Sequence, residues 1–243
     1  MSKILITGGC SFSECISTHI DTWPRHLAKS LSGYKHIPTA LGSQGNGLIS
    51  KKIIYNVSQL LKTESHENLL VGVMWSGTSR HEMYSSYLLP GFENNAFHWQ
   101  VNPSSVVKNV RPNWYIFNHH WEIPLVKQYY RTYFDEIGST ISTIEHILRV
   151  QWFLKNNNVR YFMSTFMDEV LDPRMVSHDD VKYLHDMIDM DQFLPVSSEY
   201  TWCKNKSMFQ FPNKDDPHPG TEQHGEFTEK VILPFLKQKG YIG

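Results

Sequence analysis

Residues 69–75 (LLVGVMW) form an unbroken apolar run with the length of a β-strand. A strand that is apolar at every position is buried on both faces, which is typical of a parallel sheet covered by helices on two sides. Residues 3–7 form another short apolar run, and the glycine pair Gly8-Gly9 ends it. These two runs favour an α/β fold built on a parallel sheet.

Segments with helical signals separate the apolar runs. Ile49, Ile53 and Val57 recur at the spacing of one helix face. Thr22 is suited to cap a helix N-terminus, and Gly33 is suited to end that helix. The predicted strands are 3–7, 36–41, 69–75 and 159–166, the predicted helices are 22–32, 48–62, 139–155, 179–193 and 221–237, and 196–214 is predicted to be a loop.

The order of these elements predicts a doubly wound parallel sheet wrapped by helices. The 243 residues suit one domain, residues 1–243. Residues 76–131 are rich in Asn, Pro, Gly and aromatic side chains and have no sustained period, so we interpret them as an insertion, or a lid over a site, after the third strand. Ligands of such sheets bind beyond the carboxyl ends of the strands.

The overall charge gives no reason to expect a nucleic acid or a membrane surface as a partner. Lys and Arg total 23 against 24 Asp and Glu, a formal charge of −1. No apolar stretch approaches the roughly 18 residues of a membrane span, and the N-terminus does not resemble a signal peptide. The three cysteines, Cys10, Cys15 and Cys203, then indicate reduced thiols and a cytoplasmic location.

No motif predicts a cofactor or a metal. The glycines of residues 42–47 do not follow the first strand and lack dinucleotide-binding spacing, and no phosphate-binding Gly-Lys-Ser/Thr occurs. Cys10 and Cys15 lack the paired spacing of a zinc site. The neighbours His119 and His120 could bind a metal or a substrate, although a packed or solvated pair is the commoner role.

Two distant stretches carry side chains suited to nucleophilic catalysis. Ser11 lies on the turn that follows the first strand, and His218 lies just before the final helix. A serine hydroxyl becomes a useful nucleophile when a base takes its proton, and a carboxylate commonly orients that base. We predict Ser11 as nucleophile, His218 as base and Asp215 as the orienting acid, with Asp216 as the alternative acid.

This combination resembles the SGNH (GDSL-like) hydrolase family. Gly9-Cys10-Ser11-Phe12-Ser13 is similar to its first block, residues 40–46 (ALGSQGN) to its second, and Asp215-Asp216-Pro217-His218-Pro219 to its Asp-x-x-His block. The resemblance implies a flavodoxin-like, three-layer α/β/α fold and a serine esterase without a cofactor. It also implies that the backbone amides of Ser11 and Gly45 bind the oxyanion.

The third block departs from the family pattern. The resemblance implies a Gly-x-Asn-Asp sequence here, whose Asn completes the oxyanion hole, but this chain has Trp75-Ser76-Gly77-Thr78 and no Asn. Ser76 and Thr78 are candidate replacement donors, and Arg80 and Trp75 are candidate substrate-binding residues. Losing one oxyanion donor typically lowers the rate by about 100- to 1000-fold.

The leading prediction is an esterase that acts on a small-molecule or carbohydrate ester, with O-acetyl groups of a carbohydrate as the preferred substrate class. The aromatic side chains of the insertion could stack on sugar rings or pack the insertion onto the domain (Trp99, Trp114, Tyr115, Phe117, Trp121). Two alternatives stay open: a noncatalytic binding or assembly protein that keeps the fold, and a thiol enzyme that uses Cys10. The oligomeric state is not predicted, and a tailed-phage source is a further expectation from the resemblance.

Overall fold

A four-stranded parallel sheet forms the centre of the computed structural model, which describes residues 3–14, 19–92, 114–213 and 215–243. The strand order is β2 (Tyr34–Pro38), β1 (Lys3–Gly8), β3 (Leu69–Trp75) and β6 (Arg160–Thr165). Each neighbouring pair is parallel. The predicted α/β class and its parallel sheet are confirmed.

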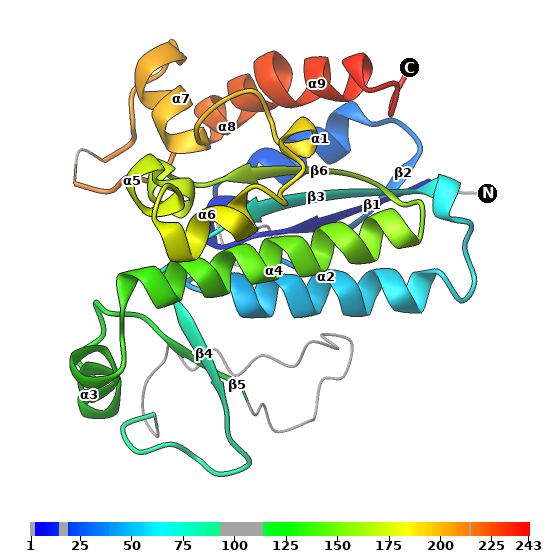
Figure 1. Cartoon of the computed structure of the whole chain (residues 1–243). Coiled ribbons are helices and arrows are strands. Elements are labelled where there is room, and N and C mark those ends of the chain that lie inside the picture. The colour runs from blue at the N-terminus through cyan, green and yellow to red at the C-terminus, as the bar shows by residue number, and fades with distance from the viewer. Residues whose placement is uncertain (1–2, 15–18, 93–113, 214) are drawn as a thin grey trace.

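Helices cover both faces of this sheet, giving three layers (Figure 1). On one face lie α2 (Asn46–Leu60) and α4 (Glu136–Asn156), which pack against each other. On the other lie α1 (Trp23–Ser30), α8 (Thr221–Phe227) and α9 (Leu233–Gln238), with a π-helical turn joining α8 to α9. The doubly wound arrangement predicted from the order of elements is therefore present.

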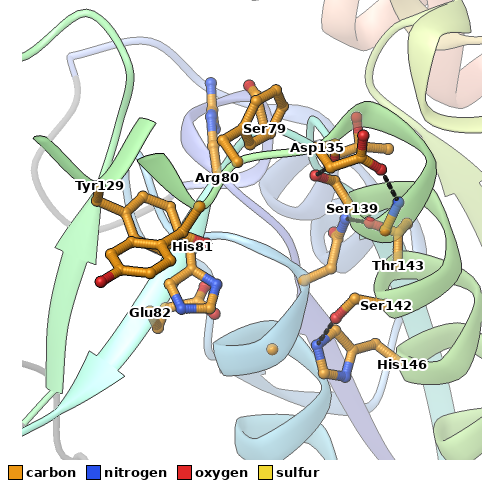
Figure 2. A pocket seen from close by; sticks show the side chains of 16 residues that line it. Ser79, Arg80, His81, Glu82, Tyr129, Asp135, Ser139, Ser142, Thr143 and His146 are labelled. Carbon is orange, nitrogen blue, oxygen red and sulfur yellow. Dashed lines mark hydrogen bonds between the residues drawn. The ribbon is translucent and has the colours of Figure 1, made fainter. Parts of the chain in front are cut away.

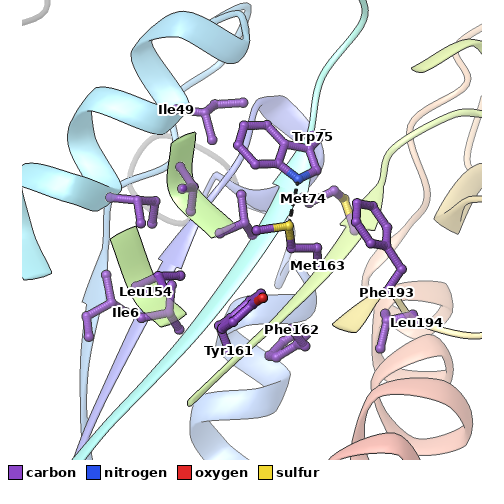
Figure 3. Packing of buried hydrophobic residues seen from close by; sticks show 14 of the residues in the cluster. Ile6, Ile49, Met74, Trp75, Leu154, Tyr161, Phe162, Met163, Phe193 and Leu194 are labelled. Carbon is purple, nitrogen blue, oxygen red and sulfur yellow. Dashed lines mark hydrogen bonds between the residues drawn. The ribbon is translucent and has the colours of Figure 1, made fainter. Parts of the chain in front are cut away.

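The core lies between the sheet and its two helical layers, where strand side chains interdigitate with those of the helices (Figure 3). All seven residues of β3 are buried, as the unbroken apolar run predicted. Gly72 on this strand lies against Phe162 and Trp23, where an added Cβ would come within 2.6 Å of the Phe162 ring. The close approach of the two rings therefore requires glycine there.

We expect Leu70→Ala to lower the free energy of unfolding by about 2–5 kcal/mol, because it removes buried methyl groups and leaves a cavity. Leu70 on β3 has an exposed fraction of 0%. Urea denaturation followed by circular dichroism measures the change. Leu88→Ala is the matched control, because the Leu88 side chain is 54% exposed. Equal losses in the two variants would contradict the assignment of β3 to the core.

Two parts of the C-terminal half differ from the prediction. The helix predicted at 179–193 ends early, as α6 (Asp179–His185). The Gln151 side chain on α4 bonds both Met187 O and Asp189 N, and these bonds hold the following backbone against α4 instead of in a helix. Ahead of α6 lies a further short helix, α5 (Pro173–Val176).

The loop predicted at 196–214 contains a helix, α7 (Glu199–Lys206). Its N-terminus is capped by Ser198, whose hydroxyl accepts from Thr201 N at 3.1 Å. The first helical residue, Glu199, is fully buried and bonds His224 on α8 at 2.7 Å. A long-range polar contact thus stabilises α7, and such a contact leaves no periodic signal in the sequence.

The insertion contains regular structure where it is described. An antiparallel pair, β4 (His81–Tyr84) and β5 (Trp114–Phe117), is followed by α3 (Pro124–Thr132). Tyr115 and Phe117 are buried and contact Phe92, in keeping with the packing role for these aromatic side chains. Trp99 and Cys15 lie outside the described residues. Within the described part of the chain, no helix combines the length and apolar character needed to cross a bilayer.

Candidate active site

The turn after β1 holds Ser11 at the carboxyl end of the sheet. Ser11 begins a single 3₁₀ turn that ends at Ser13. The turn requires glycine at position 9, because an added Cβ would lie 2.7 Å from Ser13 Cβ and 3.1 Å from Met74 O. The buried Trp23 donates its indole N–H to Ser13 Oγ at 2.8 Å, which anchors the turn to α1.

The structure brings His218 to Ser11, as the sequence predicted. Nε2 of His218 lies 2.7 Å from Ser11 Oγ. The imidazole ring also packs against Phe12, with ring centroids 4.8 Å apart, and Phe12 in turn makes an edge-to-face contact with Phe166. Packing on Phe12 therefore orients the imidazole toward the hydroxyl.

The carboxylate that contacts His218 is Asp216, so the prediction of Asp215 as orienting acid is corrected to its stated alternative. Asp216 Oδ1 bonds His218 Nδ1 and also accepts from the His218 backbone N–H at 3.0 Å. The amide of Asp215 instead donates to Asn213 Oδ1, at 3.0 Å. The hydrogen bond from the His218 backbone N–H to Asp216, two residues earlier, closes a tight turn around Pro217. This turn places the Asp216 carboxylate beside the imidazole ring.

The Asp216 carboxylate is suited to stabilise a protonated imidazole. Burial favours its neutral form, but hydrogen bonds from the side chain and backbone of His218 outweigh this effect and hold the pKa of Asp216 below its ordinary value. Asp216 is therefore ionised at neutral pH, and it fixes the tautomer in which Nε2 of His218 faces Ser11 as an acceptor.

Contacts from α8 hold the loop that carries Asp216 and His218. Glu226 Oε2 accepts from Ser207 Oγ at 2.6 Å and from Met208 N at 3.0 Å. Gln223 donates to Phe209 O at 3.3 Å and accepts from the Gly220 backbone N–H at 3.0 Å. The loop is thus tied to the helix at both of its ends.

Ser11 and His218 open into a pocket of about 530 Å³, called here the Ser11 pocket. Its walls come from the turn after β1, the loop after β2, the segment after β3, the end of β5, the loop after β6 and the loop before α8. All four strands of the central sheet thus contribute through the segments that follow their carboxyl ends, where ligands of doubly wound sheets bind.

The glycine that lines the Ser11 pocket is Gly42, so the prediction of Gly45 is corrected. The chain turns at Ser43, whose φ is +61°, and Gly45 then caps the N-terminus of α2 beside Arg80 O and Glu82 Oε1. The Gly42 amide donates to Glu14 Oε2 at 2.9 Å, so in this structure a side chain already occupies this donor.

The structure does not place Ser76, Thr78 or Trp75 in the Ser11 pocket. Ser76 is fully buried, and its hydroxyl accepts from Arg80 Nη1 at 2.8 Å. Thr78 lines two neighbouring cavities instead. Trp75 belongs to the core, where its indole N–H donates to Met163 Sδ at 3.4 Å (Figure 3). These three candidate roles are therefore corrected.

Arg80 does line the Ser11 pocket, as expected of a substrate-binding candidate. Its guanidinium lies over the Phe166 ring, 5.3 Å from the centroid. The histidine pair of the insertion also lines the pocket, and His119 Nδ1 lies 3.3 Å from Ser79 Oγ. No group of three or more His, Cys, Asp or Glu side chains suited to a metal occurs among the described residues.

Asn118, at the end of β5, is a pocket residue that the sequence reasoning missed. It is 7% exposed, and its Oδ1 accepts from His120 N at 3.1 Å. That bond identifies the oxygen, which leaves Nδ2 as a donor without a partner in the described part of the chain. The available signal was the position of Asn118 directly after a short apolar strand, inside a segment interpreted as irregular.

Comparisons with known proteins add a distant structural likeness. No family model matches the chain, and no curated protein matches it. Among solved structures, a "Crystal Structure of TesA" aligns over 97% of this chain and 99% of its own, with a TM-score of 0.47 and 11% sequence identity. A likeness this weak carries no argument about function.

Proposed function

We propose that this chain is a serine hydrolase of the SGNH type that cleaves carboxylic esters by acyl transfer. One observation carries the proposal: Ser11 Oγ lies 2.7 Å from His218 Nε2, while Asp216 bonds Nδ1 of the same ring. A hydroxyl, an imidazole and a carboxylate in this order form the arrangement that activates a serine nucleophile.

In the proposed reaction, Ser11 Oγ attacks the ester carbonyl while His218 Nε2 takes the hydroxyl proton. His218 then gives that proton to the departing alcohol, and an acyl group stays on Ser11. A water molecule, deprotonated by His218, attacks the acyl group, and His218 returns that proton to Ser11 Oγ as the acid leaves. Asp216 stabilises the imidazolium in both steps without accepting its proton.

Asn118 Nδ2 is the side-chain donor we propose for the oxyanion, together with the backbone N–H of Ser11. This amide occupies the role for which the third sequence block offered only Ser76 or Thr78, but it comes from the insertion. The Gly42 amide becomes a further donor only if the Glu14 carboxylate moves away from it.

Asn118→Ala is expected to lower kcat for ester hydrolysis by about 100- to 1000-fold, the usual cost of one oxyanion donor. Asn118→Asp is the companion variant, because it keeps the Oδ1 acceptor for His120 N, removes the donor and adds a negative charge that opposes the oxyanion. Steady-state kinetics with p-nitrophenyl acetate measure both losses. An unchanged kcat in both variants would exclude Asn118 from the oxyanion hole.

Acetyl esters of a carbohydrate are the substrate class that we favour. Ser43, Ser79, Arg80 and Asn118 give the wall of the Ser11 pocket hydrogen-bonding groups, which suit a hydroxyl-rich alcohol. The apolar part of the wall includes Phe12, Phe166, Met167 and Pro217. We expect the acyl group of the substrate to contact these apolar side chains.

A fluorophosphonate probe tests the proposal directly, because it phosphonylates only an activated serine. Mass spectrometry of tryptic peptides is expected to find the adduct on Ser11. Hydrolysis of p-nitrophenyl esters and of acetylated sugars is measured in parallel. A protein that is neither labelled nor active on any of these substrates would contradict the proposal and favour the noncatalytic binding protein.

A further inference from the structure

A second cavity adjoins the Ser11 pocket. It has a volume of about 230 Å³ and is called here the Glu82 pocket. Ser79 and Arg80 line both cavities, so this segment separates them. Figure 2 shows side chains of β4 and α3 on one side of the Glu82 pocket and those of α4 on the other (His81, Glu82 and Tyr129 against Ser139, Ser142 and His146).

Two buried polar atoms in the walls of this pocket have no hydrogen-bond partner in the described part of the chain. They are Glu82 Oε1 and His146 Nδ1. The other oxygen and the other nitrogen of these groups lie near Gly47, where an added Cβ would be 2.5 Å from Glu82 Oε2 and 3.3 Å from His146 Nε2. His146 Nε2 also lies 3.4 Å from Ser142 Oγ. Glu82 and His146 both line the pocket, so a ligand there meets a carboxyl and an imidazole, two groups that exchange hydrogen bonds with a ligand.

The charges around the pocket favour a neutral ligand. Lys51 Nζ would lie 3.4 Å from a Cβ added at Gly47, so a cation lies close to the Glu82 carboxyl. Burial raises the pKa of Glu82 to about 7, although Lys51 acts in the opposite direction. Burial, aided by Arg149 and Lys51, lowers the pKa of His146 to about 3, so the imidazole is neutral. Arg80 and Asp135 also line the pocket, so its walls carry charges of both signs and suit a ligand without net charge.

The size and the walls of the pocket suit one hydroxyl-rich ring. At 230 Å³ the pocket is smaller than the roughly 300–1,000 Å³ of a drug-sized site, so it takes a compact group. The His81 ring stacks on Tyr129, with centroids 4.8 Å apart and planes 15° apart, and this pair forms an aromatic wall. A hydroxyl group both donates and accepts, so it can pair with a carboxyl oxygen and with either tautomer of an imidazole.

We propose that the Glu82 pocket is a recognition subsite for one sugar ring in the alcohol part of the ester substrate. The inference rests on the proposed function, because it assigns the ester bond to Ser11 in the adjoining pocket. A substrate that occupies both cavities passes over Ser79 and Arg80, and its sugar hydroxyls bond Glu82 and His146.

Ser142→Leu tests the subsite by filling it, because Ser142 lines the pocket from α4. The test substrate is whichever of glucose pentaacetate, xylose tetraacetate and a mono-O-acetyl N-acetylglucosamine the wild type cleaves best. We expect kcat/KM for this substrate to fall about 10- to 100-fold in Ser142→Leu, mainly through a higher KM. Hydrolysis of p-nitrophenyl acetate, which has no sugar ring, is expected to stay within about twofold of wild type. Glu145→Gln, at an exposed position of α4, is the matched control.

His146→Gln is a second variant, which keeps a polar side chain but removes the imidazole. Equal losses on both kinds of substrate, or no loss on the acetylated sugar in either variant, would overturn the subsite. Saturation-transfer NMR with glucose, xylose and N-acetylglucosamine reads binding without hydrolysis. If the wild type binds a sugar and Ser142→Leu does not, the result supports the subsite. This holds even if p-nitrophenyl acetate and the fluorophosphonate probe show that Ser11 is inert. Absence of sugar binding by the wild type counts against the subsite.

Discussion

Ser11→Ala and His218→Ala are each expected to lower kcat for ester hydrolysis by about 10⁴- to 10⁶-fold, because members of a serine triad act as a unit. Without the hydroxyl no acyl group can be transferred to the chain. Without the imidazole the hydroxyl keeps its proton. The double variant is expected to lose little more than either single variant. Initial rates with p-nitrophenyl acetate, corrected for buffer hydrolysis, measure these losses.

Two controls separate lost chemistry from lost structure. Within the described part of the chain the Ser11 hydroxyl bonds only His218, so Ser11→Ala is expected to unfold at the urea concentration of the wild type. Cys10→Ala tests the thiol alternative. Cys10 is fully buried, and we expect this variant to keep its activity, as we expect the wild type to do after iodoacetamide treatment. Turnover by Ser11→Ala at the wild-type rate would remove Ser11 from the mechanism.

Asp216→Asn is expected to lower kcat by about 10³- to 10⁴-fold, because an amide in this position favours the wrong imidazole tautomer and cannot stabilise the imidazolium. The same assay measures the loss. The effect is expected in kcat more than in KM, since Asp216 bonds His218 and does not line the Ser11 pocket.

Asp215→Asn is the matched control for this prediction. It makes the same chemical change one residue earlier, where the backbone amide bonds Asn213 and the structure gives no contact with His218. We expect Asp215→Asn to stay within about threefold of wild-type kcat. A large loss in Asp215→Asn with little change in Asp216→Asn would reverse the assignment of the orienting acid.

The sequence predicted the central elements well because their signals are local. The apolar run of β3 and the helical period of α2 each reflect burial of one segment against the sheet. The helix α7 was missed because the buried pair of Glu199 and His224 stabilises it across a gap in the chain. Contacts of this kind depend on where another segment lies.

The site divides in the same way. The sequence alone determined that a serine follows the first strand and that a histidine precedes the last helix, because strand, turn and cap signals fix the places of Ser11 and His218. Only the tertiary structure decided the groups around them: Asp216 instead of Asp215, Gly42 instead of Gly45, and Asn118 from the insertion. Neighbouring residues in a loop can carry similar side chains that point in different directions. The packing of distant segments determines which of these side chains points into the site.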